Sequence, residues 1–240
     1  MMIFFDIDDT LLDNQKAERA AAIEFHRLHQ DVFPVSPQGF AVLWRDATEK
    51  HVRRYLLGEL SFQGQRRERL KEIFAEHRTL SDAEADTLFE TYLDFYEKNW
   101  TLFPDVESCL DQLVGTRLGI ISNGQAYQQR QKLIKVGIID RFSIVTISEE
   151  LGISKPDRRI FLEACRAAKV SPSECWHIGN NINADAQGSL SAGLRGVWLN
   201  RNNMNCFQGI PTIKSLSELK EIIDSQNQSP HPITRMKGYG

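Results

Sequence analysis

The 240 residues of the chain include 41% hydrophobic and 25% charged side chains, the composition of an ordinary globular protein. The net charge of -3 and the pI near 6.1 leave no basic excess of the kind that binding to a nucleic acid polymer or an acidic membrane surface requires. The opening MMIFF is too short for the hydrophobic part of a secretion signal, and no later apolar run approaches a membrane span. We therefore predict a cytoplasmic protein, monomeric or homodimeric, with neither nucleic acid nor membrane as a partner.

A short apolar strand over 3–6 opens the chain, and helical periodicity follows it from about Asn14 to Trp100. Apolar side chains recur in this segment at steps of three and four residues, with few β-branched runs. Ser81 stands three residues before Glu84, which is the pattern of a capping box at a helix start. We predict four helices here, at about 14–30, 37–58, 62–77 and 82–99.

The pattern changes after Pro104 to short apolar runs that alternate with helical stretches. Such alternation is typical of parallel β-α-β units whose strands are buried on both faces. The predicted strands are 117–122, 142–148, 175–180 and 195–200, and the predicted helices lie near 105–114, 125–136, 157–169, 183–192 and 216–224.

This order of elements predicts the α/β class, a doubly wound parallel sheet with an inserted α-helical cap domain. The strand over 3–6 would join the sheet from the far side of the helical segment. We therefore expect an α/β core from 1–13 and 101–224, and a helical cap from 14–100. The segment 225–240 is polar and lacks periodicity, so we expect a C-terminal extension with no catalytic part.

Polar side chains follow the predicted strands at the points where those strands end. In doubly wound sheets, ligands bind beyond the carboxyl ends of the strands, so these side chains indicate the chemistry. Together they offer carboxylates, a hydroxyl, amides and an ammonium group. The set comprises Asp6, Asp8, Ser122, Asn123, Asn180 and Asp185, with Lys155 in a loop further along the chain.

Four stretches of the sequence resemble the motifs of haloacid dehalogenase (HAD) superfamily phosphatases, in the order in which that family has them. DIDDT (6–10) resembles the D-x-D-x-T motif, and IISN (120–123), SKPD (154–157) and IGNNINAD (178–185) resemble the second, third and fourth motifs. Within the superfamily, ISNG (121–124), ISEELGISKPDRRIF (147–161) and VWLN (197–200) are most similar to the house-cleaning pyrimidine 5'-nucleotidase group. The resemblance implies a phosphomonoester hydrolase for a small phosphorylated metabolite, first of all a nucleoside 5'-monophosphate.

The resemblance also implies a role for each polar residue. Residues two apart in an extended segment point the same way, so Asp6 and Asp8 can share a site while Asp9 points elsewhere. Asp6 would attack phosphorus and become a phosphoaspartate, and Asp8 would protonate the leaving oxygen and then deprotonate the attacking water. The phosphate would be neutralised by Lys155 and bound by Ser122 and the amide of Asn123, with Thr10 fixing the loop or the nucleophile.

A divalent cation is needed in this scheme because the nucleophile and the phosphate are both anionic, and oxygen donors suit Mg²⁺. The resemblance implies ligands from Asp6, from the backbone carbonyl of Asp8 and from the first residue of the fourth motif. That residue is Asn180 where the family has aspartate, and a neutral oxygen in place of a charged one weakens the coordination. Asp185 is a further candidate partner of the metal, or else a first-turn helix acid.

Two other functions stay open on the sequence alone. A haloacid dehalogenase keeps the nucleophile but attacks carbon without a metal and lacks the second acid, so Asp8 argues against it. A weakly active or non-catalytic binding protein would keep the pocket, and Asn180 is its support. In the cap, the basic stretch 45–71 and Trp44 fit either an anion-attracting, base-stacking surface or solvated helix faces over a core, and we favour the second.

Overall fold

The apolar opening segment forms β1 (Met2–Phe5), which lies inside a six-stranded parallel sheet with the order β3-β2-β1-β4-β5-β6. All four residues of β1 are buried, as strands covered on both faces require. Phe5 pairs with Ile120 of β2 on one side and with Ile178 of β4 on the other, so three strands end side by side. The remaining strands are β2 (Arg117–Ser122), β3 (Ile144–Ile147), β4 (Cys175–Gly179), β5 (Arg195–Leu199) and β6 (Thr212–Ile213).

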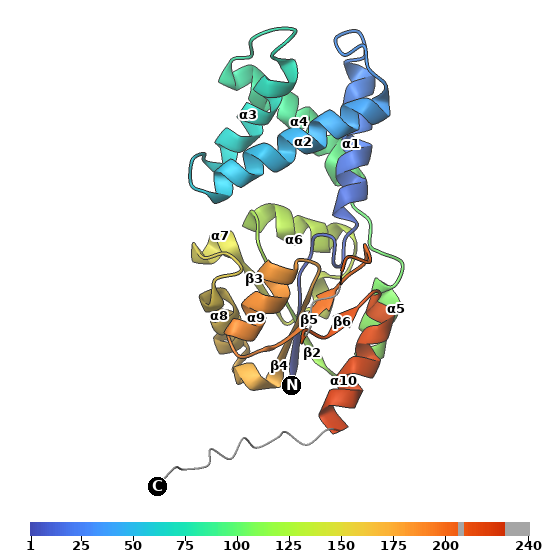
Figure 1. The fold of residues 1–240 in the computed structure, drawn as a ribbon, viewed down its shortest axis with the longest axis vertical. Helices are drawn as coiled ribbons and strands as arrows, with labels where there is room; N and C mark the ends of the chain where they lie inside the picture. The colour runs from blue at the N-terminus through green and yellow to red at the C-terminus, as the bar shows by residue number, and fades with distance from the viewer. Residues whose placement is uncertain (206–208, 229–240) are drawn as a thin grey trace. The chain divides into compact units, whose positions relative to one another are not determined.

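The helices of this α/β unit lie on the two flanks of the sheet, as Figure 1 shows for α5 beside α10 and, on the other flank, α8 beside α9. One apolar cluster packs Phe4 and Ile121 of the sheet against Phe161 and Ala164 of α8. The doubly wound α/β fold that the sequence predicted is therefore confirmed. The helices are α5 (Val106–Gln112), α6 (Ala126–Lys135), α7 (Ser148–Leu151), α8 (Arg158–Ala168), α9 (Gly188–Ser191) and α10 (Leu219–Gln228).

Two predicted elements differ from the computed structural model, which describes residues 1–205 and 209–228, and two observed elements were not predicted. The predicted helix 183–192 is a π-helical turn, Ile182–Gln187, followed by the short helix α9. The predicted start of the extension 225–240 is too early, because α10 continues to Gln228 through a stretch without proline. The rest of the predicted extension, 229–240, lies outside the described residues. Strand β6 and helix α7 were not predicted, since two and four residues are too short to show a period.

The helical segment forms a separate unit, Leu12–Thr101, while the α/β unit comprises Met1–Leu11 and the chain from Leu102 onward. Serine N-caps at Ser36, Ser61 and Ser81 each accept a backbone N–H at the third helical residue, and Ser81 completes the expected capping box with Glu84. These caps explain why the predicted helix starts are right to the residue. The helices are α1 (Asn14–Leu28), α2 (Pro37–Leu56), α3 (Phe62–Phe74) and α4 (Asp82–Lys98).

Trp44 lies in the core of the helical unit and offers no exposed stacking face. Its side chain is 1% exposed and stacks on Tyr92, with ring centroids 4.1 Å apart. Phe25 and Phe40 pack against the same indole. The interpretation of Trp44 as a core residue is therefore confirmed, and the base-stacking role is ruled out for this conformation.

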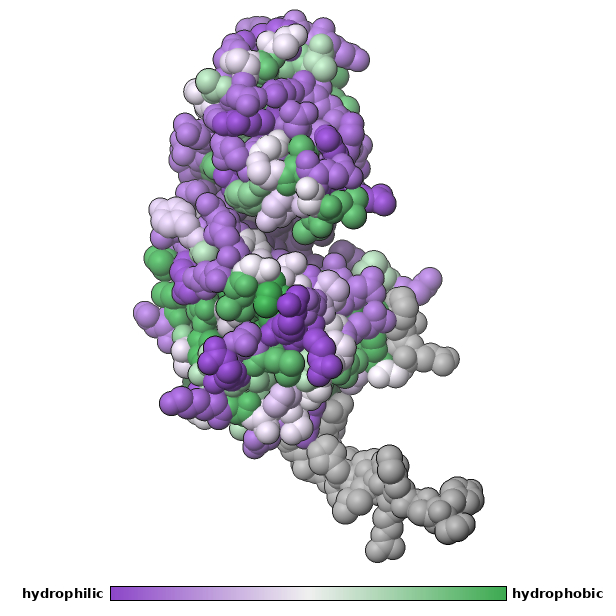
Figure 2. Space-filling model, turned by 90° about the vertical axis from the view of Figure 1, so that its left-hand side faces the viewer, coloured by the Kyte–Doolittle hydropathy of each residue, from purple (hydrophilic) through white to green (hydrophobic). Residues whose placement is uncertain are grey.

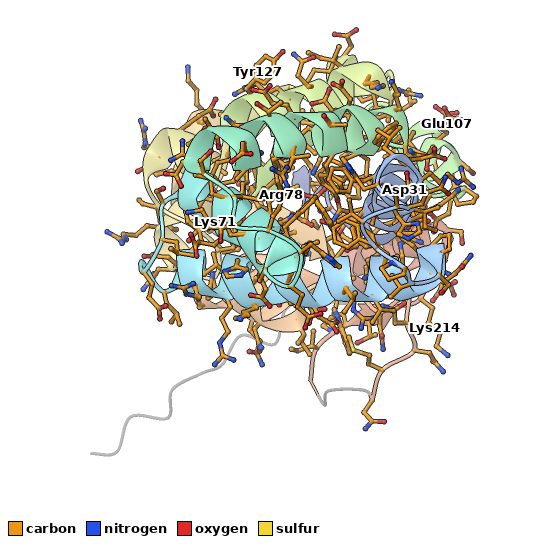
Figure 3. All side chains as sticks on the ribbon, turned by 90° about the horizontal axis from the view of Figure 1, so that it is seen from above. Asp31, Lys71, Arg78, Glu107, Tyr127 and Lys214 are labelled. Carbon is orange, nitrogen blue, oxygen red and sulfur yellow. The ribbon has the colours of Figure 1, made fainter. Side chains whose placement is uncertain are left out.

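Most cations of the basic stretch 45–71 pair with carboxylates. Arg67 contacts Asp82 and Asp86, and Lys71 contacts Asp82, whereas the buried Arg69 donates to Gln65. Figure 3 labels Lys71, and Figure 2 shows hydrophilic side chains covering most of the helical unit on the face it presents. For most of these residues the charge split therefore marks complementary, solvated helix faces. In the described part of the chain, no helix has the length and apolar character that crossing a bilayer demands.

Candidate active site

The Asp6 carboxylate is the meeting point of four chain segments. Asp6 follows β1 directly, and its backbone N–H donates to Ile178 O at 2.9 Å, which extends the pairing of β1 with β4. Oδ1 accepts from Lys155 Nζ at 2.6 Å and from Ser122 Oγ at 3.3 Å, and Oδ2 accepts from Thr10 Oγ1 at 3.2 Å. The structure thus brings together four of the residues that the sequence selected. The contacts hold the carboxylate in one orientation beyond the strand end.

Burial raises the pKa of Asp6 to about 6, against an ordinary value of 3.8. The nearby Lys155 ammonium lowers the pKa, but the like charges of Asp185 and Asp8 raise it again. The carboxylate is therefore ionised at neutral pH, although burial disfavours its charge.

Lys155 is buried, and its ammonium group donates three hydrogen bonds. The acceptors are Asp6 Oδ1 at 2.6 Å, Asp185 Oδ1 at 2.6 Å and the backbone oxygen of Ile121 at 2.9 Å. Burial alone would lower the pKa of Lys155, but the charges of Asp185 and Asp6 outweigh it and the pKa is raised. Lys155 therefore stays protonated and keeps its charge 2.6 Å from Asp6.

Asp185 supports Lys155 from the side away from Asp6. Besides the ammonium, its Oδ1 lies 3.1 Å from His177 Nε2, and its Oδ2 accepts the Asn181 N–H at 2.9 Å. The π-helical turn carries this side chain under Gly179, where an added Cβ would stand only 2.2 Å from the Asp185 carboxyl carbon. Its Oδ1 thus accepts from Lys155 and faces His177, and its Oδ2 accepts one backbone N–H, so its predicted role as a partner of the metal stays a prediction. His177 is fully buried on β4.

Asn123 joins the second and third motifs. Its Oδ1 accepts the Lys155 backbone N–H at 2.8 Å, and its Nδ2 donates to Lys155 O at 3.0 Å. The side chain therefore fixes the loop that carries the lysine. Its predicted contact with phosphate through the backbone amide stays a prediction.

Asp8 contacts two residues that the sequence analysis missed. Its Oδ1 lies 2.5 Å from Lys132 Nζ, and its Oδ2 accepts from Gln129 Nε2 at 2.9 Å. Both partners come from α6, whose buried face consists of Gln129, Lys132 and Leu133. The sequence carried no signal for them, because polar residues three apart on a helix are typical of a solvated face. Asp9, left out of the predicted site, is a turn residue with a left-handed φ of 58°.

Asn180 lies against Thr10 at the edge of the Asp6 site. Its backbone N–H donates to Thr10 Oγ1 at 3.0 Å, and its Oδ1 lies 3.5 Å from the same hydroxyl. Thr10 thus connects the side chains of Asp6 and Asn180. The backbone oxygen of Asn180 accepts from Trp198 Nε1 at 2.9 Å, which anchors the residue to β5.

The oxygen donors around Asp6 fit a magnesium ion. Within residues 1–205 and 209–228, no group of three or more His, Cys, Asp or Glu side chains is arranged to hold a metal. Mg²⁺ nevertheless needs few protein ligands because it keeps several waters. Asp6 and Asn180 offer such an ion a carboxylate and an amide oxygen, and Thr10 Oγ1 contacts both side chains.

The comparisons with known proteins agree with this geometry. A family model described as haloacid dehalogenase-like hydrolase matches residues 1–193. The chain belongs to this family. The HAD fold and a HAD-type hydrolase activity are therefore established for this chain by its sequence.

The relatives of this HAD-type hydrolase include phosphatases with different named substrates. The chain is 30% identical over 205 residues to a glyceraldehyde 3-phosphate phosphatase from Methanopyrus kandleri, and the match covers 83% of each protein. It is 31% identical over 147 residues to the pyrimidine 5'-nucleotidase YjjG from Escherichia coli, covering 59% of this chain and 65% of that protein. The solved structure of a 2-haloacid dehalogenase from Pseudomonas syringae is similar with a TM-score of 0.69 at 29% identity, covering 94% and 98%. Phosphatase activity is supported, and the substrate differs among the relatives.

Replacing Asp6 by Asn should stabilise the fold at a pH well above 6, because the buried charge that raises the pKa of Asp6 is removed. A raised pKa means that the wild type loses stability as the pH rises from 3.8 through about 6. The gain of the variant at high pH should amount to at most about 3 kcal/mol, and it should shrink toward zero near pH 3.8. Thermal midpoints measured with a chelator across this pH range test the expectation.

Asp140→Asn is the matched control, because Asp140 is an exposed aspartate of the same unit. Its midpoint should follow the wild type at every pH. A lower midpoint for Asp6→Asn at high pH would show that Asp6 contributes to stability there, against the account given above.

Proposed function

We propose that the protein is a Mg²⁺-dependent phosphomonoester hydrolase that acts through a phosphoaspartate on Asp6. The observation that supports this most is the buried Asp6 carboxylate, held by Lys155, Ser122 and Thr10 with Asp8 two residues away. A nucleophile needs a fixed orientation and an ionised oxygen, and these contacts supply both. Phosphatase relatives at 30% and 31% identity support the same reaction class.

In this proposal Asp6 attacks phosphorus, and the bond between phosphorus and the leaving oxygen breaks. Asp8 donates its proton to that oxygen, and the resulting carboxylate then takes a proton from the water that hydrolyses the acyl phosphate. Lys155 balances negative charge on Asp6 and on the transferred group, while Ser122 can turn its hydroxyl from Asp6 to a phosphate oxygen. Asp6, Asn180 and the backbone carbonyl of Asp8 would hold Mg²⁺, which would supply positive charge to offset the negative charge of the nucleophile and the phosphate.

Asp8 favours hydrolysis of an oxygen ester over dehalogenation. A halide leaves as an anion without a proton, whereas an alkoxide leaving group needs one. Asp8 lies close enough to Asp6 for its charge to raise the pKa of Asp6. The likeness to a 2-haloacid dehalogenase structure is one of fold and does not carry its substrate to this chain. Release of halide from a 2-haloacid, without release of phosphate from any ester, would reverse this preference.

A nucleoside 5'-monophosphate is the substrate that we propose first. Its support is the likeness of the stretches around Ser122, Lys155 and Trp198 to the nucleotidase group, together with the match to YjjG. The buried Trp44 and the paired basic residues of α2 and α3 no longer add to that support. Glyceraldehyde 3-phosphate is the competing candidate, because a relative with that activity matches more of the chain.

Phosphate release from a panel of esters tests the proposed function. The wild type should hydrolyse at least one nucleoside 5'-monophosphate with a larger kcat/KM than glyceraldehyde 3-phosphate or any hexose phosphate. Asp6→Asn should lower turnover at least about a thousandfold, because an amide cannot form the covalent intermediate. Asp140→Asn should keep wild-type activity. Equal activity of Asp6→Asn and wild type would contradict the reaction, and a preference for another ester would contradict only the substrate.

Asn180→Asp should strengthen the response to Mg²⁺. A carboxylate facing the ion adds an attraction on the order of 1 kcal/mol, so the half-saturating Mg²⁺ concentration should fall roughly fivefold. Calorimetric titration of Mg²⁺ gives the same change in affinity without reference to turnover. Asn183→Asp adds the same charge at an exposed residue of the π-helical turn and should change neither quantity. Unchanged affinity in Asn180→Asp would exclude Asn180 as a ligand.

A further inference from the structure

The buried face of α6 presents polar side chains where a core-facing helix normally has apolar ones. Gln129 is 2% exposed and Lys132 is 2% exposed, and both lie beside the fully buried Leu133. Burying an ammonium group is strongly unfavourable unless a group of opposite charge lies beside it. Packing alone therefore does not explain why polar residues are buried at positions 129 and 132.

Both side chains are directed at the Asp8 carboxylate, one at each oxygen. Lys132 Nζ lies 2.5 Å from Oδ1, and Gln129 Nε2 lies 2.9 Å from Oδ2. Asp8 itself is less enclosed than its partners, with 31% of its side chain exposed. The carboxylate is thus held from behind by two buried donors while part of it remains open to a reacting group.

Gln129 also connects Asp8 to the residues around the nucleophile. The same Nε2 lies 2.9 Å from Ser122 Oγ and 3.0 Å from the backbone oxygen of Asn123. Its Oε1 is buried and has no hydrogen-bond partner within the described residues. An unsatisfied buried oxygen carries a penalty in folding free energy, and the contacts of Nε2 hold this orientation against it.

We propose that Lys132 and Gln129 are positioning residues that fix the Asp8 carboxylate for proton transfer to and from the reacting oxygen. The inference rests on the proposed function, because it assigns Asp8 the acid role in that reaction. Two donors on two oxygens restrict rotation of the carboxylate about its side-chain bonds. Gln129 at the same time keeps Asp8 in a fixed relation to Ser122, which is the proposed phosphate ligand. Neither residue needs to touch the substrate.

The leaving group of the ester separates this role from a general structural one. Formation of the phosphoaspartate from an alkyl phosphate requires a well-placed acid, whereas p-nitrophenolate leaves without one. Lys132→Met should therefore lower kcat/KM for a simple alkyl phosphate at least about tenfold, with a change within about twofold for p-nitrophenyl phosphate. A disturbance of the whole site would lower both values by the same factor.

The background Asp8→Asn gives the second measurement. If Lys132 acts through the Asp8 carboxylate, Lys132→Met should change the alkyl-phosphate rate of Asp8→Asn by no more than about twofold. Lys135→Met is the matched control, because Lys135 is exposed on the same helix, and it should behave as wild type with both esters. Lys132→Gln, which removes the ammonium group and shortens the side chain, carries the same expectation should Lys132→Met fail to fold.

Equal losses for both esters, or the same loss in wild type and in Asp8→Asn, would overturn the positioning role while leaving the phosphatase proposal intact. A wild type that hydrolyses neither ester nor any member of the panel would overturn the proposed function and, with it, this inference. Selective loss of the alkyl ester in Lys132→Met, absent from Lys135→Met and from the Asp8→Asn background, supports it.

Discussion

The structure of the site depends on the buried contact between Lys155 and Asp6. Two charges removed from water repay their desolvation only when each also finds further partners. Lys155 has Asp185 and a strand-end carbonyl as well, and Asp6 has Ser122 and Thr10. The cluster can form because β1 lies between β2 and β4, so that the three strands end beside one another. The parallel sheet is therefore the reason why distant motifs become one site.

The two aspartates after β1 lie in different surroundings, although they are separated by a single residue. Asp6 is buried, and burial raises its pKa to about 6, while hydroxyl groups and Lys155 hold it still. Asp8 is partly exposed and faces donors from α6. A nucleophile must be ionised and immobile, whereas a proton carrier must reach both leaving oxygen and water. The division of surroundings matches the division of roles that we propose.

Much of the architecture could be predicted because its signals are local. Apolar runs with polar ends gave the strands, and serine caps such as Ser36 and Ser81 gave helix starts. The motifs then gave Asp6, Ser122 and Lys155, which the structure brings together. Features that depend on three-dimensional packing could not be predicted from the local sequence pattern. An example is the π-helical turn that places Asp185 under Gly179.

Gln129 and Lys132 are functional candidates that the sequence could not predict for the same reason. In a sequence, polar residues three apart on a helix suggest a solvated face, and only their burial against Asp8 reveals their partner.

Trapping the covalent intermediate tests the central claim most directly. Borohydride reduction of the acid-quenched enzyme during turnover should convert Asp6, and no other aspartate, to homoserine in peptide mass spectra, and the product should be absent without substrate. Turnover without homoserine at this position, or with homoserine elsewhere, would contradict the account.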